Sequence, residues 1–257
     1  MKLIMNADDF GLSESVNNGI VECFKSGIVT STTIMMNQKG VKHATLLYKQ
    51  GLVPEIGLHF TVTAGQPLSD PATVSSLVDA NGYFLNRKIL MTKNVCEEEV
   101  YIELKAQYNA AIKAGFDINH IDSHHFAGVY PPLKKAFIRF ANETGLPVRR
   151  IDNIVSGQDG LTVPTPDAFG AQFFDDGVSL EQLQALLLTY KDTLSSNGIL
   201  ELMCHPSTED NSDLTELTSY LAMRVVERDL LTSPELLHWL KAEGIECVGF
   251  NALAFSC

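Results

Sequence analysis

Near its start the chain reads Leu3-Ile4-Met5-Asn6-Ala7-Asp8-Asp9-Phe10-Gly11. The apolar run at its beginning predicts a first strand, and the two adjacent carboxylates then stand at the carboxyl end of that strand. Neighbouring carboxylates repel each other, and such a pair is tolerated best where a cation or a shared proton relieves the repulsion. We therefore expect Asp8 and Asp9 to mark a functional strand end, where one carboxylate can hold a metal ion while the other handles a proton.

Strand-like and helix-like segments alternate along the rest of the chain, which is typical of a parallel sheet with crossover helices. Together with the length of 257 residues, the alternation favours an α/β fold that is a closed or nearly closed β/α barrel of about seven strands. We expect the whole chain, 1–257, to form a single domain. After the first strand, further strands are expected near 28–36, 56–62, 118–124, 148–151, 199–205 and 246–250. Helices are expected from Ser13 to Gly27 and near 40–50, 97–114, 132–144 and 179–196, with two more before the last strand.

Two irregular insertions interrupt this alternation, at about 64–96 and 152–178. Both are rich in Gly, Pro and polar residues. Such segments are expected to lie as loops over one end of the sheet, where loops commonly shape a substrate site.

Bulk composition narrows the class of protein. With 45% hydrophobic residues the chain can bury a sizeable core, and its net charge of −12 argues against nucleic acid and disfavours an anionic membrane surface. The five cysteines contain no CxxC pair, so neither a zinc knuckle nor a disulfide framework is indicated, and a reducing cytoplasm fits best. No apolar stretch approaches the roughly 20 residues that span a bilayer, and polar residues interrupt any N-terminal signal. We expect a cytoplasmic protein with a small-molecule substrate; a homodimer stays an open alternative.

Ionisable residues recur at the carboxyl ends of the expected strands, which is where β/α barrels carry their chemistry. No single one of these residues is decisive, but their recurrence at the same structural position predicts that they converge in space. The ends in question carry Asp8 and Asp9, His59, the pair His124-His125, and His205.

One carboxylate and two imidazoles leave positions open on a divalent metal ion, an arrangement that polarises a carbonyl and lowers the pKa of bound water. We assign Asp9, His59 and His124 as the metal ligands. Asp8 is then free to act as general base on the attacking water, and His205 to protonate a departing amine.

Two further residues are expected to support this set. Asp122 lies two residues before His124, on the same face of a regular strand, and is expected to orient a ligand from behind. His125 would point to the opposite face of such a strand, so we expect it to pack or to face the substrate. Arg149 and Arg150 sit at a further strand end, and one of them is expected to contact the base or the substrate, with the choice between them open.

Each of these residues also has a plainer interpretation. Asp8 or Asp9 could satisfy backbone N–H groups at a helix start. His59 could be a hydrogen-bonded core histidine, and His205, which precedes Pro206, could simply end a strand.

Five motifs now occur together and in a fixed order, and together they resemble the YdjC/ChbG family of carbohydrate deacetylases from residue 4 to about residue 233. The resemblance implies a β/α-barrel-like fold, a divalent metal ion that is usually magnesium, and hydrolysis of N-acetyl groups on amino sugars such as diacetylchitobiose. The motifs are Asn6-Ala7-Asp8-Asp9-Phe10-Gly11, Gly27-Ile28-Val29-Thr30-Ser31-Thr32-Thr33, Gly57-Leu58-His59-Phe60, His120-Ile121-Asp122-Ser123-His124-His125 and Met203-Cys204-His205-Pro206.

By match of motif the resemblance implies the same roles as above. The metal residues are Asp9, His59 and His124, the base is Asp8 and the acid is His205. One departure is that many relatives have a third histidine where this chain has Phe126, which changes the groove beside the site and so bears on the substrate more than on the reaction.

Several alternatives follow from the same residues. Two imidazoles favour zinc by ligand softness, whereas the resemblance favours magnesium. A metal-dependent sugar isomerase or phosphodiesterase is a second reading, but phosphate chemistry favours more cations than Arg149 and Arg150 supply. A non-catalytic sugar-binding protein is a third, and it has no need for both Asp8 and Asp9.

Overall fold

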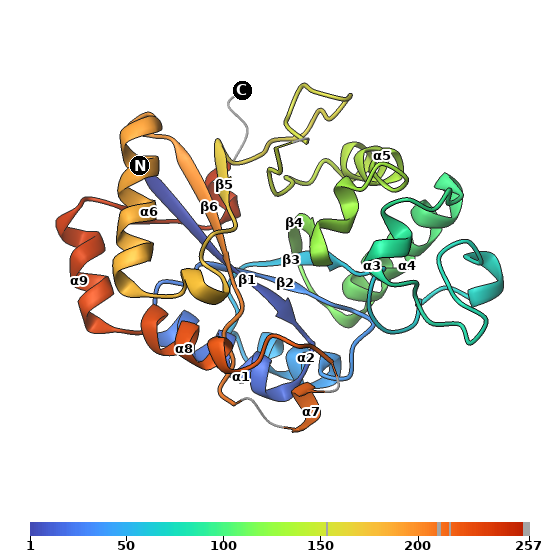
Figure 1. Cartoon of the computed structure of the whole chain (residues 1–257), viewed down its shortest axis with the longest axis horizontal. Helices are drawn as coiled ribbons and strands as arrows, with labels where there is room; N and C mark the ends of the chain where they lie inside the picture. Colours follow the sequence, from blue (N-terminus) through green and yellow to red (C-terminus); the bar gives the residue numbers. More distant parts are fainter. Residues whose placement is uncertain (153, 210–211, 216, 254–257) are drawn as a thin grey trace.

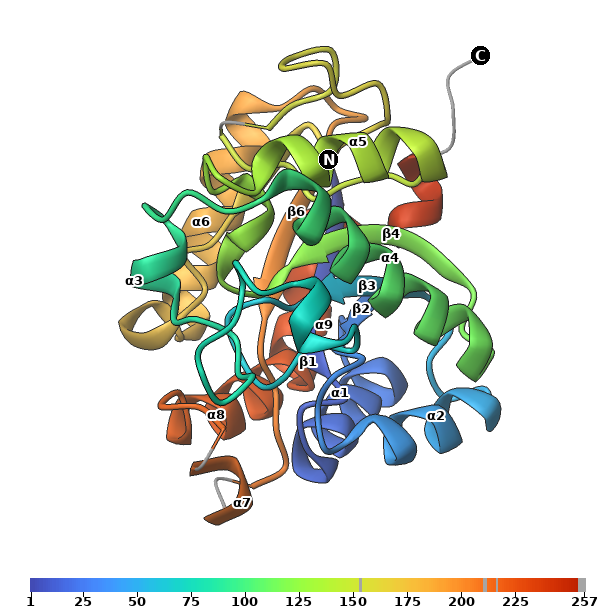
Figure 2. The same cartoon turned by 90° about the vertical axis from the view of Figure 1, so that its right-hand side faces the viewer.

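The computed structural model describes residues 1–152, 154–209, 212–215 and 217–253. Within these residues seven strands form one parallel sheet, in the order β4-β3-β2-β1-β6-β5 with β7 also paired to β1. The sheet curls into a half-barrel with helices packed around its outside (Figure 1, Figure 2). This confirms the expected barrel-like α/β fold. The strands are β1 (Lys2–Phe10), β2 (Ser31–Ile34), β3 (Ile56–Phe60), β4 (Ile118–Ser123), β5 (Ala168–Gly170), β6 (Ile199–Cys204) and β7 (Glu246–Cys247).

The helices and short 3-10 turns connect these strands on the outer face and at the two ends. The α-helices are α1 (Glu14–Ser26), α2 (Val41–Lys49), α3 (Arg87–Leu90), α4 (Glu97–Ala114), α5 (Lys134–Thr144), α6 (Leu180–Thr193), α7 (Ser212–Thr215), α8 (Ala222–Leu231) and α9 (Pro234–Ala242). The 3-10 turns are η1 (Pro71–Thr73), η2 (His124–Val129), η3 (Asp175–Gly177) and η4 (Phe250–Leu253). Among the described residues no helix is both long and apolar enough to cross a membrane.

Strand β1 is the centre of the sheet. It is buried along almost its whole length, as a parallel strand covered on both faces must be. One of its edges pairs with β6 from Lys2 to Ala7, so the other edge carries β7 at its start and β2 from Asn6 onward. The carboxyl end of β1 therefore lies between the ends of β2 and β6, in the middle of the half-barrel.

Local sequence signals set the helix boundaries as expected. At the start of α1 the Ser13 hydroxyl accepts a hydrogen bond from the Val16 N–H at 3.2 Å. Helices α4 and α5 end at Gly115 and Gly145, which adopt φ of 96° and 71°, a left-handed conformation that glycine takes at little cost.

The structure differs from the sequence expectation around the fifth strand. Val148 makes only an isolated parallel bridge with Ile121, so 148–151 is not a regular strand. The fifth strand is instead β5, inside the insertion at 152–178, where it pairs with β6. Its sequence Ala-Phe-Gly has little β-propensity, and the strand forms because the exposed edge of β6 offers a partner.

Candidate active site

The carboxyl end of β1 is irregular, and this brings both of its carboxylates into one site. Asp9 has φ of 70°, in the left-handed region that non-glycine residues rarely adopt, and the register between β1 and β2 shifts between Ala7 and Phe10. In a regular strand Asp8 and Asp9 would point to opposite faces. Here both are buried, 3% and 1% exposed, and each has a ligand atom within 4.8 Å of a nitrogen of the same imidazole, that of His59.

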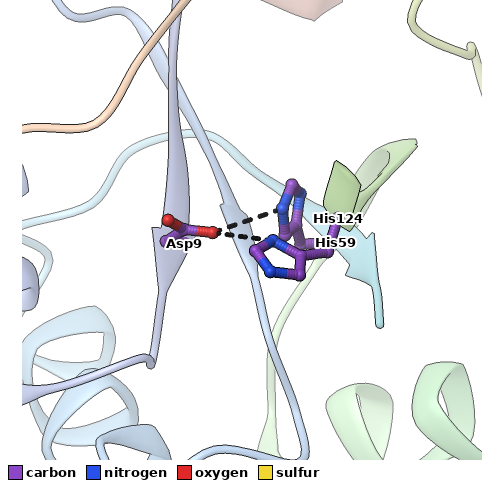
Figure 3. A group of neighbouring side chains, drawn as sticks. All are labelled: Asp9, His59 and His124. Carbon is purple, nitrogen blue, oxygen red and sulfur yellow. Dashed lines mark ion pairs between the residues drawn. The ribbon is translucent and has the colours of Figure 1, made fainter. Parts of the chain in front are cut away.

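Asp9, His59 and His124 converge from three different elements, β1, β3 and η2 (Figure 3). The Oδ1 atom of Asp9 lies 3.4 Å from Nε2 of His59 and 3.2 Å from Nδ1 of His124. Asp9 Oδ1 is buried and accepts no hydrogen bond. Two imidazole nitrogens that approach one carboxylate oxygen form a donor set that fits a divalent cation.

The charges around this group set the ionisation of its members. His59 Nδ1 lies 2.7 Å from Oδ1 of Asp122, which directs Nε2 of the ring toward Asp9. Burial opposes the charged form of His59, but the Asp122 carboxylate outweighs it and raises the pKa of the imidazole to about 10. Burial likewise opposes ionised Asp9, yet the guanidinium of Arg224 and the two histidines hold the pKa of this carboxyl well below its usual range. Asp122 thus favours positive charge at His59, and the cations around Asp9 keep its carboxylate ionised.

Asp122 contacts one of the three residues assigned as metal ligands, His59. Strand β4 lies beside β3, and their register pairs Asp122 with His59. The Thr33 hydroxyl donates to the other oxygen of Asp122 at 3.1 Å, so both carboxylate oxygens are engaged.

His125 does not lie on the face opposite His124. Strand β4 ends at Ser123, and His125 and Phe126 then take φ of 55° and 57° in η2. The rings of His124 and His125 consequently lie side by side, with centroids 3.9 Å apart. His125 Nδ1 lies 3.0 Å from the hydroxyl of Thr63, so its contacts are with the rim of the site.

Asp8 occupies a different environment from its neighbour. Arg149 donates to both of its oxygens, at 2.6 and 2.7 Å, and Asn6 Nδ2 donates to Oδ1 at 2.9 Å. Oδ1 therefore has both lone pairs engaged, whereas Oδ2 keeps one, and Oδ2 lies 3.9 Å from Nε2 of His205. Burial would raise the pKa of Asp8, but the charge and hydrogen bonds of Arg149 outweigh it and hold that pKa far below its usual range.

Arg149, rather than Arg150, is the arginine of this site. It is 2% exposed, and besides Asp8 it bonds Oε1 of Glu201 at 2.6 Å and lies 3.0 Å from Oδ2 of Asp122. One guanidinium thus neutralises part of the charge of three buried carboxylates. A second group with metal-ligand spacing, formed by Asp8, His59 and Asp122, surrounds this region and already contains its cation in Arg149.

His205 follows β6 and faces Asp8. Burial lowers the pKa of its imidazole to about 4, so the ring is neutral near pH 7 until a proton is delivered to it. Its Nδ1 is buried without a hydrogen-bond partner, and its backbone N–H donates to Glu227. Two aromatic rings, Phe174 and Tyr220, lie edge-on to it at centroid distances of 5.4 and 5.8 Å.

Helix α8 contributes two site residues that the sequence reasoning missed. Arg224 donates through Nη2 to Oδ2 of Asp9 at 2.6 Å, which leaves the other oxygen of Asp9 for a metal. Glu227 accepts from the His205 N–H and the Tyr220 hydroxyl, and burial raises its pKa to about 7. Both side chains are almost fully buried.

A signal for these two residues exists in the sequence. Arg224, Glu227 and Leu231 share one face of the helix by their i, i+3, i+7 spacing, so two opposite charges occupy a face that ends in a core leucine. Charged residues on a buried face are rarely tolerated without partners, which points to a polar site beneath the helix.

Comparison with known proteins identifies the family of this chain. The model of the family described as YdjC-like protein matches residues 2–242. A carbohydrate deacetylase of Thermoanaerobacter pseudethanolicus is 38% identical over 98% of both chains, and one of Clostridium beijerinckii is 36% identical over 98% of this chain and 99% of its own.

Two solved structures are similar as well. One, from Enterococcus faecalis, is described as "a putative cellobiose-phosphate cleavage protein" and superimposes with a TM-score of 0.90, 33% identity and 99% coverage of both chains. A Streptococcus mutans CE4 esterase, with a TM-score of 0.54, 9% identity and coverage of 96% of this chain and 85% of its own, shares the fold.

Proposed function

We propose that this chain, which belongs to the YdjC-like family, is a deacetylase that removes N-acetyl groups from amino sugars with the help of one divalent metal ion. Acetylated chitooligosaccharides such as diacetylchitobiose are the substrates we propose. The observation that carries the proposal is the convergence of two imidazoles on one Asp9 oxygen that accepts no hydrogen bond, beside an ionised Asp8 that faces a histidine.

The metal would be held by Asp9, His59 and His124. A divalent ion there supplies a Lewis acid that polarises the acetamide carbonyl and lowers the pKa of a bound water. The resemblance favours magnesium for this site, and the two imidazoles favour zinc.

Asp8 and His205 would move the protons. The free lone pair on Asp8 Oδ2 accepts a proton from the attacking water as its oxygen bonds to the carbonyl carbon. His205, which is neutral at rest, takes this proton from Asp8 and delivers it to the amide nitrogen, so that the C–N bond breaks and the products are acetate and a free amino sugar. Nε2 of His205 and Oδ2 of Asp8 are 3.9 Å apart, so the proton that leaves the water is close to the ring that must supply one.

Arg149 keeps Asp8 ionised and fixed in orientation without occupying the lone pair that the reaction needs. Arg224 does the same for Asp9 from the other side. A phosphodiesterase is less well supported, because both buried arginines are already bonded to carboxylates and neither is free to bind phosphate.

The test is acetate release from diacetylchitobiose and from a panel of other N-acetylated sugars. The purified protein is assayed as isolated, after treatment with a chelator, and after restoring either Mg²⁺ or Zn²⁺. We expect chelation to abolish acetate release and one of the two ions to restore it. Acetate release that persists at full rate after complete metal removal would overturn the metal mechanism, and no release from any sugar would overturn the deacetylase proposal.

A further inference from the structure

We propose that Phe174, backed by Tyr220, is an aromatic platform that stacks on the apolar face of the pyranose ring whose acetamide is cleaved. This inference rests on the proposed function and names how the same site recognises its substrate. Phe174 lies in the insertion at 152–178, between β5 and η3.

The local backbone conformation places the side chain of Phe174 at the surface. Phe173 is fully buried, whereas Phe174 is 38% exposed. Phe174 is extended, with φ of −157° and ψ of 141°, and successive side chains of an extended segment point to opposite sides. Phe173 therefore anchors the loop in the core while Phe174 is directed outward, next to His205.

The ring of Phe174 is held from behind by Tyr220. The two rings stack with centroids 4.1 Å apart and an interplanar angle of 18°. Tyr220 is itself fixed, because its hydroxyl donates to Glu227 and accepts from the backbone N–H of Asp175 at 3.1 Å. An exposed aromatic ring that is immobilised in this way presents a preformed contact surface.

The platform and the proposed acid share one support. Glu227 bonds both the Tyr220 hydroxyl and the His205 N–H, and the Phe174 ring meets the His205 ring at 5.4 Å. The amine that His205 would protonate is bonded directly to a pyranose carbon. The ring that carries it must therefore lie beside His205 and within reach of Phe174.

The chemistry of the ligand fits this surface. A pyranose has a face of C–H groups that packs on an aromatic ring and a periphery of hydroxyl groups that remain hydrated. Ligand sites combine hydrophobic and aromatic side chains with a few placed polar groups, and Phe174 beside His205 is such a combination. Phe174 would thus contribute binding to the sugar ring itself rather than to the acetyl group.

The experiment compares the variants Phe174→Ala and Phe174→Tyr with Leu237→Ala, which removes a similarly exposed apolar side chain (39%) from α9. Kinetics are measured on the sugar that the wild-type protein deacetylates. We expect Phe174→Ala to raise KM about 5- to 10-fold with kcat changed less than 3-fold, from the typical value of an aromatic contact. Phe174→Tyr keeps the ring and should stay within about 2-fold of wild type. A KM unchanged in Phe174→Ala, or a loss confined to kcat, would overturn the platform.

A binding measurement separates this proposal from the proposed function. Titration calorimetry of diacetylchitobiose into the metal-loaded Asp8→Asn protein reports binding without turnover. Weaker binding in the Asp8→Asn, Phe174→Ala double variant supports the platform even if the wild type releases no acetate. Equal binding with and without the Phe174 ring, or no binding at all, overturns the platform even if the wild type is an active deacetylase.

Discussion

Two regions of the active site meet at consecutive residues of β1. The metal side consists of Asp9, His59 and His124, and the proton side of Asp8, Arg149 and His205. On the metal side a carboxylate oxygen lacks a hydrogen-bond partner and two imidazole nitrogens point at it. On the proton side a built-in cation already satisfies the carboxylate and leaves a single lone pair free.

This difference explains how two adjacent aspartates can do different work. An incomplete donor set has affinity for an added cation, whereas a carboxylate bound to an arginine has little. The paired carboxylate instead stays ionised and oriented, which suits the acceptance of a proton. The positive φ of Asp9 is what lets both side chains enter the same site.

The largest expected effect lies on the proton side, at His205. His205→Ala should lower acetate release about 10²- to 10⁴-fold while the protein still binds its metal, because general-acid assistance is lost and the ligand set is intact. Turnover is measured by acetate release and metal content by elemental analysis. His238→Ala, on the exposed surface of α9, is the control and should behave as wild type. A His205→Ala protein with wild-type turnover would remove this residue from the mechanism.

A substitution of Arg149 tests whether this cation stabilises the carboxylates of the proton side. Arg149→Met should destabilise the fold by about 3–5 kcal/mol, because three buried carboxylates lose their shared cation. Urea denaturation measures the change. The partly exposed neighbour gives a matched control, and Arg150→Met should change stability by no more than about 0.5 kcal/mol. Equal effects of the two substitutions would contradict the assignment of Arg149.

A substitution of Asp122 tests how the metal side depends on a residue that contacts the ligand His59. Asp122→Asn should weaken metal affinity about 10- to 100-fold, since the amide no longer fixes His59 with its Nε2 toward the metal. Affinity is measured by competition with a chelator. Unchanged affinity would mean that His59 is oriented by packing alone.

The smallest effect is expected for a substitution of Thr33, whose hydroxyl donates to Asp122. Thr33→Val removes a buried hydroxyl that donates to Asp122 and should cost about 1–2 kcal/mol of stability together with a few-fold loss of metal affinity. Thr32→Val is the matched control, because that buried hydroxyl donates to the Ala7 carbonyl instead. Both should lose stability, and only Thr33→Val should lose metal affinity. If both variants bound the metal with the same affinity, the Thr33 hydroxyl would have no specific influence on metal binding.

The two regions also differ in how far they could be predicted from the sequence. Asp9 and His59 lie next to the last residues of parallel strands, and His124 follows a strand directly, so alternation and strand-end position were enough to group the three. The barrel-like fold followed from the same alternation. Position along the chain could not show that Asp122 faces His59, because that contact depends on the register between β3 and β4.

The proton side is less visible in the sequence because its supports come from irregular or distant segments. Arg149 lies where the expected strand 148–151 is reduced to an isolated bridge, so strand periodicity could not separate it from Arg150. Glu227 lies on a helix that follows the last catalytic strand, and only tertiary packing brings it beside His205, as it brings Arg224 of the same helix to Asp9 on the metal side. Strand β5 was missed because its three residues depend on the edge of β6 rather than on their own propensity.

The division of work between the two carboxylates can be tested with one pair of substitutions, Asp8→Asn and Asp9→Asn. Metal content and acetate release are measured on both proteins after dialysis against the same metal buffer. We predict that Asp8→Asn retains about one metal ion per chain and loses turnover, whereas Asp9→Asn loses the metal as well as turnover. Equal metal content in the two variants, whether both full or both empty, would contradict the separate roles of Asp8 and Asp9.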